Sequence, residues 1–581
     1  MSNLLTSLLT GSALPACFLN PFLIVRIVAP RRSSVSTFLW TAVVSLVVNM
    51  VVPLGLHLAG VAIFPLSLAF PHWVLTIVLV PAWLWRCRGR LIPSCRCENA
   101  TLLLAPWIGL CLLVMPFTHL AGIDTYKWLD LASNVGVQES IPWLVHPASL
   151  LGFTPRSYPS LQPLLLGSVQ IIGGLGVDWS YYVVSVVCAG TALLTSFRLG
   201  CACLDQPRQA GLFAFLYAFS PVFVRYTHWA TGRGFFLALF PLYLAGAAEL
   251  PKPRAWLPFF AGILLLPLAH KVGLVAVLLV PLALGASLLL PRTERRALRV
   301  VGLLCAGIVA LGVAPTRLAP FPIGNAVGAL RAAVTRFAWM LPVAAFGLVV
   351  EPWFTVPARR RLWLMGLATL PAAFHHEMYG ALLSLPFMVL AATIGLVAMV
   401  ERLPRWAPHL HRLAIALTLA GALVIVGHRS ATATPRRIRA VARFLDEHDP
   451  EGPFRILAPG DARQQIQGYV SGCPRFAIYR TGTPRLRINP PPALDGSPRS
   501  WIAPWIAYTR HMFSITGVHC ELYGMNPRFY YVVIDGNGAR PRTGELLYDE
   551  NGVRLYGPSH WRNKTDFETL NPRPASCLSS L

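Results

Sequence analysis

The side chains best suited to chemistry lie in one long segment, Gly122 to Pro163, which separates two apolar stretches. A carboxylate held just outside an apolar span can act as a general base, taking a proton from an acceptor hydroxyl while a leaving group departs. Asp124, the first carboxylate of the segment, is therefore the predicted catalytic base, and Asp130 and Glu139 are its competitors. Three further side chains of the segment are assigned to substrate binding: Lys127, Asp130 and Tyr158.

A second polar segment, 225–234, reads RYTHWATGRG and contains arginine and histidine but no carboxylate. Guanidinium and imidazolium groups can neutralise a phosphate leaving group in place of a divalent cation. His228 and Arg233 are therefore predicted to bind phosphate. Anchoring of a loop among lipid head groups is the alternative.

Other ionisable residues interrupt apolar sequence later in the chain. His270 and Lys271 lie within the apolar stretch 256–290, where charge is costly unless it faces a cavity or the interface. They are predicted to bind the donor phosphate, with a simple turn between two short helices as the alternative. Arg331 and Arg336 lie on a weakly helical segment that could steer an anionic lipid head, with surface packing as the alternative.

The run His375, His376 and Glu377 contains residue types that bind zinc. Adjacent histidines lack the spacing of a helical zinc motif, and no third partner is evident. These three residues are therefore assigned to substrate contact, with an interfacial loop as the alternative. No resident metal or cofactor is predicted.

The composition requires a membrane to surround most of these elements. The chain has 581 residues, of which 55% are hydrophobic and 13% charged, whereas soluble domains are about a quarter charged. Apolar runs of the roughly 20 residues needed to cross a bilayer recur from Ser36 to Gly427 and are missing from 430–581. We predict a polytopic α-helical membrane protein with about 11–14 transmembrane helices, comprising residues 1–428, and a soluble domain, 429–581.

Net charge is +25, and the basic residues gather in short loops between apolar runs. By the positive-inside rule these loops are cytoplasmic, which places the first outer loop, 120–160, and the segment 225–234 on the opposite side. No arginine-rich nucleic-acid motif stands out, so nucleic acid is not an expected partner. The loops assigned to the cytoplasm are 86–97, 250–254, 291–299, 358–361 and 401–406.

The apolar runs predict the path of the chain through the bilayer. Residues 4–29 are read as a helix or a re-entrant piece, because basic residues follow the run and a signal peptide has them in front. Residues 161–177 are expected to lie along the membrane. Crossings are predicted near 37–56, 71–86, 100–119, 180–199, 209–224 and 410–427.

The terminal region changes character at once. RRIRAVARFLDEHDPEG has helical spacing, and FRILA, RFAIY, RFYYVVIDG and GVRLYG are typical of strands. The prolines of 489–492 mark a loop. We expect a small mixed α/β domain outside the cytoplasm. A disulfide between Cys473 and Cys520 is an alternative to free thiols there, if the domain faces an oxidising compartment.

The order of motifs after Gly122 resembles the GT-C glycosyltransferases: G-x-D, then W and HP, then YPSLQP, an apolar stretch, and the span 179–199. AFSPVFVRYTHWATGRGFF resembles the next outward span of that superfamily. The resemblance covers roughly 120–290 and implies a polyprenyl- or dolichyl-phosphate-linked sugar as donor, with Asp124 as base. Some members carry acidic metal ligands in the second outer loop. Their replacement here argues against a metal-dependent mechanism.

The sequence thus predicts an integral membrane glycosyltransferase of GT-C type in the cell inner or plasma membrane. Its expected partners are a polyprenyl-phosphate-linked sugar donor, a glycan, lipid or protein acceptor, and membrane lipids. A transporter or lipid flippase is one alternative, although internal repeats are not evident. A polymerase or ligase of surface polysaccharide is another.

Overall fold

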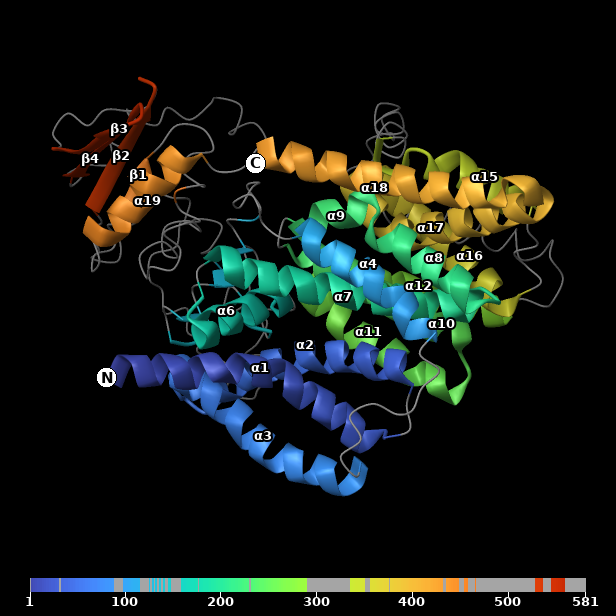
Figure 1. The fold of residues 1–581 in the computed structure, drawn as a ribbon, viewed down its shortest axis with the longest axis horizontal. Helices are drawn as coiled ribbons and strands as arrows, with labels where there is room; N and C mark the ends of the chain where they lie inside the picture. Colours follow the sequence, from blue (N-terminus) through green and yellow to red (C-terminus); the bar gives the residue numbers. More distant parts are fainter. Residues whose placement is uncertain are drawn as a thin grey trace, which may run out of the picture.

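The chain forms a large helical bundle and a small sheet covered by one helix, each with its own hydrophobic core (Figure 1). In this computed structural model the described residues are 2–30, 33–87, 98–114, 125, 128–129, 131–132, 135–136, 139–141, 145–147, 158–175, 177–228, 231–289, 335–350, 356–375, 377–431, 435–448, 454–457, 466, 528–536 and 545–559.

The first helices are α1 (Ser2–Val28), α2 (Ser34–Leu58), α3 (Pro65–Cys87) and α4 (Glu98–Val114). The first three lie together along one side of the bundle (Figure 1). Buried amides join them: Asn20 Nδ2 donates to the His72 carbonyl at 2.7 Å, and Asn49 Nδ2 donates to the Cys17 carbonyl at 3.2 Å. Residues 4–29 therefore form a helix and not a re-entrant piece, and 10–28 is long and apolar enough to cross a membrane.

Next come α6 (Leu161–Gly173), α7 (Val177–Cys203), α8 (Pro207–Ala218) and α9 (Pro221–His228). Helix α6 packs on α1, α2, α3 and α7 and is buried along most of its length, so it lies inside the bundle. The predicted course of 161–177 along the membrane stays a prediction. The predicted span 209–224 is broken: α8 and α9 meet at a bend of 56°. Ser220 and Pro221 explain the break, because the Ser220 hydroxyl accepts the Phe223 N–H at 3.2 Å and starts a new helix.

The second half contains α10 (Gly232–Glu249), α11 (Pro253–Ala269), α12 (Val272–Leu289), α15 (Met340–Val350), α16 (Pro357–His375), α17 (Glu377–Arg402) and α18 (Ala407–Ala431). Helix α10 is the centre of this half, in contact with α7, α11 and α16 (Figure 1). Every residue of α10 except Arg233 is buried. A helix that is apolar all round and enclosed on all sides fixes the positions of its neighbours.

Six helices in the described part are long and apolar enough to cross a membrane, or seven if the bent pair α8 and α9 is one span. The multi-pass membrane architecture is thus confirmed. The predicted total of about 11–14 spans stays a prediction. Several apolar helices, among them α6, α11 and α15, are too short to be counted by length alone.

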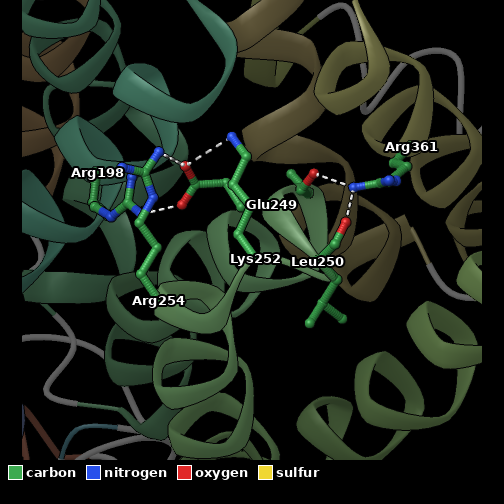
Figure 2. Close-up of polar contacts among 7 residues, drawn as sticks. Arg198, Glu249, Leu250, Lys252, Arg254 and Arg361 are labelled. Atoms are coloured by element: carbon green, nitrogen blue, oxygen red, sulfur yellow. Dashed lines mark hydrogen bonds and ion pairs between the residues drawn. The ribbon is translucent and has the colours of Figure 1, made fainter.

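A cluster of charges lies at the C-terminal end of α10 (Figure 2). The Glu249 carboxylate, whose side chain is 3% exposed, accepts hydrogen bonds from Arg198 and, at 2.9 Å, from Arg254; Lys252 lies 3.9 Å away. Arg361 donates to the Ala248 carbonyl at 2.8 Å and to the Leu250 carbonyl. This Glu249 cluster ties α7, α10, α11 and α16 together, so basic residues that the sequence assigned to membrane topology also cap and join helices.

The terminal part consists of α19 (Arg436–His448), β1 (Phe454–Leu457), β2 (Arg528–Ile534), β3 (Leu546–Glu550) and β4 (Val553–Ser559). The strand order is β1-β2-β4-β3, with β1 parallel to β2 and the other pairs antiparallel. The predicted mixed α/β class is confirmed. The predicted strand RFAIY lies outside the described residues, as do Cys473 and Cys520, between which a disulfide was considered.

The apolar face of α19 covers this sheet. Its buried residues Ile438, Val441 and Leu445 belong to one core with Val532 and Leu555 of the strands. The β3–β4 connection turns at Asn551 and Gly552, whose φ angles are 53° and 76°. Asn-Gly with two positive φ values is the preferred two-residue hairpin turn.

Replacing Glu249 with glutamine should weaken the bundle strongly, because three cations around a buried position lose their counter-charge. We expect a loss of about 1.5–3 kcal/mol in unfolding free energy, measured by thermal unfolding in detergent. The control is Asp205→Asn. The Asp205 side chain is 84% exposed, and its ion pair with Arg359 is long, at 3.4 Å. This substitution should therefore lower the unfolding free energy by less than about 1 kcal/mol. Equal effects of the two variants would show that the Glu249 cluster holds nothing together.

Candidate functional site

The predicted site residues fall into three groups: those whose side chains the structure describes, those of which it describes only the place in a helix, and those outside the described residues. Tyr158, Arg233, His270, Lys271 and Arg336 are described with their side chains. For His228, His375 and Glu377 only the place in a helix is described. Asp124, Lys127, Asp130, Arg331 and His376 lie outside the described residues, so their assignments stay predictions.

Hydrogen bonds from α7 hold the end of α9, which precedes α10 in the chain. The Thr227 carbonyl, near the end of α9, accepts the Tyr181 hydroxyl at 2.9 Å and lies 3.4 Å from the Ser185 hydroxyl, which also donates to it. Arg233, in the first turn of α10, places its guanidinium 5.6 Å from the centre of the Tyr226 ring. A cation over an aromatic face is attracted to it, so both sides of the predicted phosphate segment are fixed.

Gly232 is the point where the two predicted outer segments meet. A Cβ atom at this position would lie 2.7 Å from Cη2 of Trp128 and would collide with the Ala269 carbonyl. Trp128 belongs to the first outer loop, is 6% exposed, and meets the Tyr158 ring edge-on at 5.7 Å between centroids. The loop that contains Asp124 therefore reaches the start of α10, as the sequence predicts for converging loops.

His270 lies in the turn between α11 and α12, so the turn that the sequence kept as the alternative is what forms. Its side chain is buried, and its ring lies 5.9 Å from Tyr379 and 6.5 Å from Phe236. Burial, and then the charges of Arg233 and Lys271, lower the pKa of His270 to about 3. Its Nδ1 accepts the Val272 N–H at 3.2 Å, so the proton of this neutral ring is on Nε2.

These contacts define an Arg233 cluster, made of Trp128, Tyr158, Arg233, His270 and Tyr379. The sequence identified the three polar members that lie beside predicted span ends. It missed Trp128 and Tyr379, because aromatic residues near span ends are typical of an interfacial belt. The one available signal for Trp128 was its place four residues after Asp124 in a loop already singled out for chemistry.

Lys271 is exposed and directly follows His270, so it lies beside the cluster. Arg336 is half-buried in the helical turn 335–337, ahead of α15. Its proposed role in steering a lipid head stays a prediction.

A pair of histidines attaches the first outer loop to α2. The rings of His57 and His146 lie 5.3 Å apart, and Nδ1 of His57 accepts the Ile141 N–H at 3.3 Å. Burial, and then the charge of His57, lower the pKa of His146 to about 4. His146 belongs to the HP motif of the sequence, and this contact gives that motif a role in holding the loop.

Within the described residues, no three His, Cys, Asp or Glu side chains come together in a way that could hold a metal ion. The carboxylates of the first outer loop and the 375–377 side chains are outside that set. The metal-independent mechanism therefore stays a prediction.

Replacing Gly232 with alanine should disrupt the Arg233 cluster, because the added methyl group collides with backbone and with Trp128. We expect a loss of about 1–3 kcal/mol in unfolding free energy and faster proteolysis of the first outer loop. Gly55→Ala in α2 is the control, because its added Cβ meets nothing within 4 Å. Proteolysis of the loop at the same rate in both variants would argue against the contact.

No protein-family model matches the sequence, and no curated protein matches it. Among solved structures, the chain is similar to ArnT from Cupriavidus metallidurans bound to undecaprenyl phosphate, at 11% sequence identity and a TM-score of 0.45. The likeness covers 79% of this chain and 98% of that one.

Proposed function

We propose that this protein is an integral membrane glycosyltransferase that moves a sugar from a polyprenyl-phosphate donor to an acceptor hydroxyl outside the cytoplasm. The observation that carries the proposal is the Arg233 cluster. In it, the loop that contains the predicted base lies beside the Arg233 guanidinium, the buried neutral ring of His270 and the aromatic rings of the cluster. These are the components needed to hold an anionic leaving group beside a nucleophile.

The proposed reaction is one displacement at the anomeric carbon of the donor sugar. The Asp124 carboxylate takes the proton of the acceptor hydroxyl, and the acceptor oxygen bonds to the anomeric carbon. The bond from that carbon to the phosphate oxygen breaks, and its electron pair leaves with the polyprenyl phosphate. The products are the glycosylated acceptor, the lipid phosphate and a protonated Asp124, which returns its proton to water.

Arg233 supplies the positive charge for the departing phosphate. Its guanidinium is half-buried and fixed on Tyr226, so it offers several donors at one place without a metal ion. The neutral His270 acts as a hydrogen-bond donor through Nε2, and it is not the imidazolium that sequence reasoning allowed for such sites. The exposed Lys271 beside it adds a second charge for the phosphate.

The acceptor is proposed to approach from the side that holds the terminal domain, where a glycan, lipid or protein would meet Asp124. The short link from α18, which ends at Ala431, to α19, which begins at Arg436, keeps that domain near the end of the last span. We propose that this domain lies outside the cytoplasm.

One observation favours a transporter or flippase as the second candidate. The break between α8 and α9 resembles the discontinuous helices that line transport pathways. In transporters such breaks occur at matching positions in two repeats. The described residues contain one bent pair of this kind, so glycosyl transfer is the better-supported proposal.

Replacing Asp124 with asparagine should reduce sugar transfer by at least about 100-fold, because a general base contributes that much. The assay incubates purified protein in nanodiscs with radiolabelled polyprenyl-phosphate sugars and crude envelope acceptors. Asp130→Asn tests the competing carboxylate, and Asp205→Asn is the neutral control. EDTA should leave the transfer rate unchanged.

Full transfer by a folded and inserted Asp124→Asn protein would remove Asp124 from the mechanism. Loss of transfer only in Asp130→Asn would move the base to that residue. Abolition by EDTA would require a metal-dependent reaction. Movement of lipid or solute across proteoliposomes, with no transfer from any donor, would favour the second candidate.

A further inference from the structure

Two hydroxyl groups at helix N-termini next to the Arg233 cluster have no hydrogen-bond partner among the described residues. Thr231 occupies the N-cap of α10 and is 2% exposed, and Ser160 precedes α6 and is 0% exposed. Neither Oγ atom makes a hydrogen bond. A buried hydroxyl without a partner costs stability, so both positions need an explanation.

Helix capping does not explain why these two hydroxyls are buried without a partner. A threonine or serine at this position normally accepts a hydrogen bond from the N–H two or three residues later. Thr231 has the extended backbone suited to a cap, with φ −98° and ψ 155°, yet its hydroxyl caps nothing. Ser160 has helical angles, φ −84° and ψ −28°, which do not suit a cap. Both hydroxyls therefore stay available to another acceptor.

The two helix ends come together through aromatic contacts. Tyr158, two residues before Ser160, packs edge-on against Trp128 at 5.7 Å. Trp128 in turn lies against Gly232, the residue directly after Thr231. The start of α12 follows the His270 turn, where the Ala269 carbonyl meets the same Gly232. The N-terminal regions of α6 and α10 thus lie beside Trp128.

A helix N-terminus carries a partial positive charge and free N–H groups, so it favours an anion. Arg233 adds a full charge in the first turn of α10. A phosphate group has three acceptor oxygens, enough to use a guanidinium, backbone N–H groups and two hydroxyls together.

We propose that the N-termini of α6 and α10 form a phosphate-binding site, called the phosphate seat below. In it the Ser160 and Thr231 hydroxyls donate hydrogen bonds to the bound phosphate, and Arg233 supplies the positive charge. The inference rests on the proposed glycosyl transfer and names the place where the phosphate of the lipid donor binds. Both hydroxyls are buried, so the phosphate meets the half-buried Arg233 first and reaches them after the covering side chains move.

The test measures binding to the full-length protein in nanodiscs with three probes: a polyprenyl phosphate of defined length, the matching polyprenol and inorganic phosphate. Thr231→Val should raise the Kd for the polyprenyl phosphate about 10-fold or more, as expected for one charge-assisted hydrogen bond. Ser160→Ala should act in the same direction. Thr231→Ser should keep wild-type affinity, and polyprenol binding should not change.

The melting temperature separates a ligand role from a structural one. Thr231→Val should keep or raise it, because the hydroxyl makes no bond in the protein itself. The matched control is Thr195→Val, whose buried hydroxyl on α7 donates across to the Ala238 carbonyl of α10 at 2.5 Å. That control should lower the melting temperature and leave the Kd unchanged.

Each other outcome has a distinct meaning. Unchanged affinity in Thr231→Val and Ser160→Ala, while wild type binds and transfers sugar, overturns the seat and leaves the proposed function. A lower melting temperature of Thr231→Val with an unchanged Kd also overturns it. Inorganic phosphate bound as tightly as the lipid phosphate, and weakened by Thr231→Val, supports the seat but contradicts a lipid donor.

Discussion

Close backbone packing between α10 and α11 is the constraint on which the rest of the bundle depends. A Cβ on Gly246 would lie 2.5 Å from the Phe259 nitrogen, and a Cβ on Gly262 would lie 2.5 Å from Cβ of Tyr243. At the other end, Gly232 meets the Ala269 carbonyl. In a bilayer the hydrophobic effect does not draw apolar helices together, so small residues that allow close contact do this instead.

This packing holds Arg233 and Glu249, at the two ends of α10, about 24 Å apart at a rise of 1.5 Å per residue. At its C-terminal end, the single buried carboxylate of Glu249 is matched by basic side chains of α7 and the α10–α11 connection, which makes a rigid joint. At its N-terminal end, Arg233 packs on an aromatic ring beside a histidine whose pKa is strongly lowered. The same helix therefore has a structural end and an end whose polar groups suit an anionic ligand.

The sequence predicted most of the membrane architecture, because an apolar run of sufficient length is a direct physical requirement for crossing a bilayer. The runs 37–56 and 410–427 correspond to α2 and α18, with ends a few residues longer. The burial of α6 inside the bundle was not predicted, since a short apolar run does not show which other helices will cover it. The strand β3 was missed, because LLYDE alternates weakly and pairs only through β4.

For the site, the sequence supplied the ionisable residues but not their environment. Arg233 was predicted from a polar segment without carboxylates and His270 from an ionisable residue within apolar sequence, and their approach follows from the tertiary packing of α10 and α11. The neutral state of His270 depends on burial by Phe236 and Tyr379, which lie far apart in the chain. The free hydroxyl of Thr231 was not predictable either, since its residue type at a helix start normally indicates a cap.

The most direct measurement of the central claim, that the Arg233 cluster holds the phosphate end of a lipid donor, is photo-crosslinking. A polyprenyl phosphate with a diazirine on the first isoprene unit is bound to the protein in nanodiscs, irradiated and mapped by peptide mass spectrometry. We expect labelled peptides around 226–234 and 268–272, and we expect this labelling to be lost on competition with unlabelled polyprenyl phosphate. Labelling around Glu249 instead, or labelling that polyprenol competes away equally well, would contradict it.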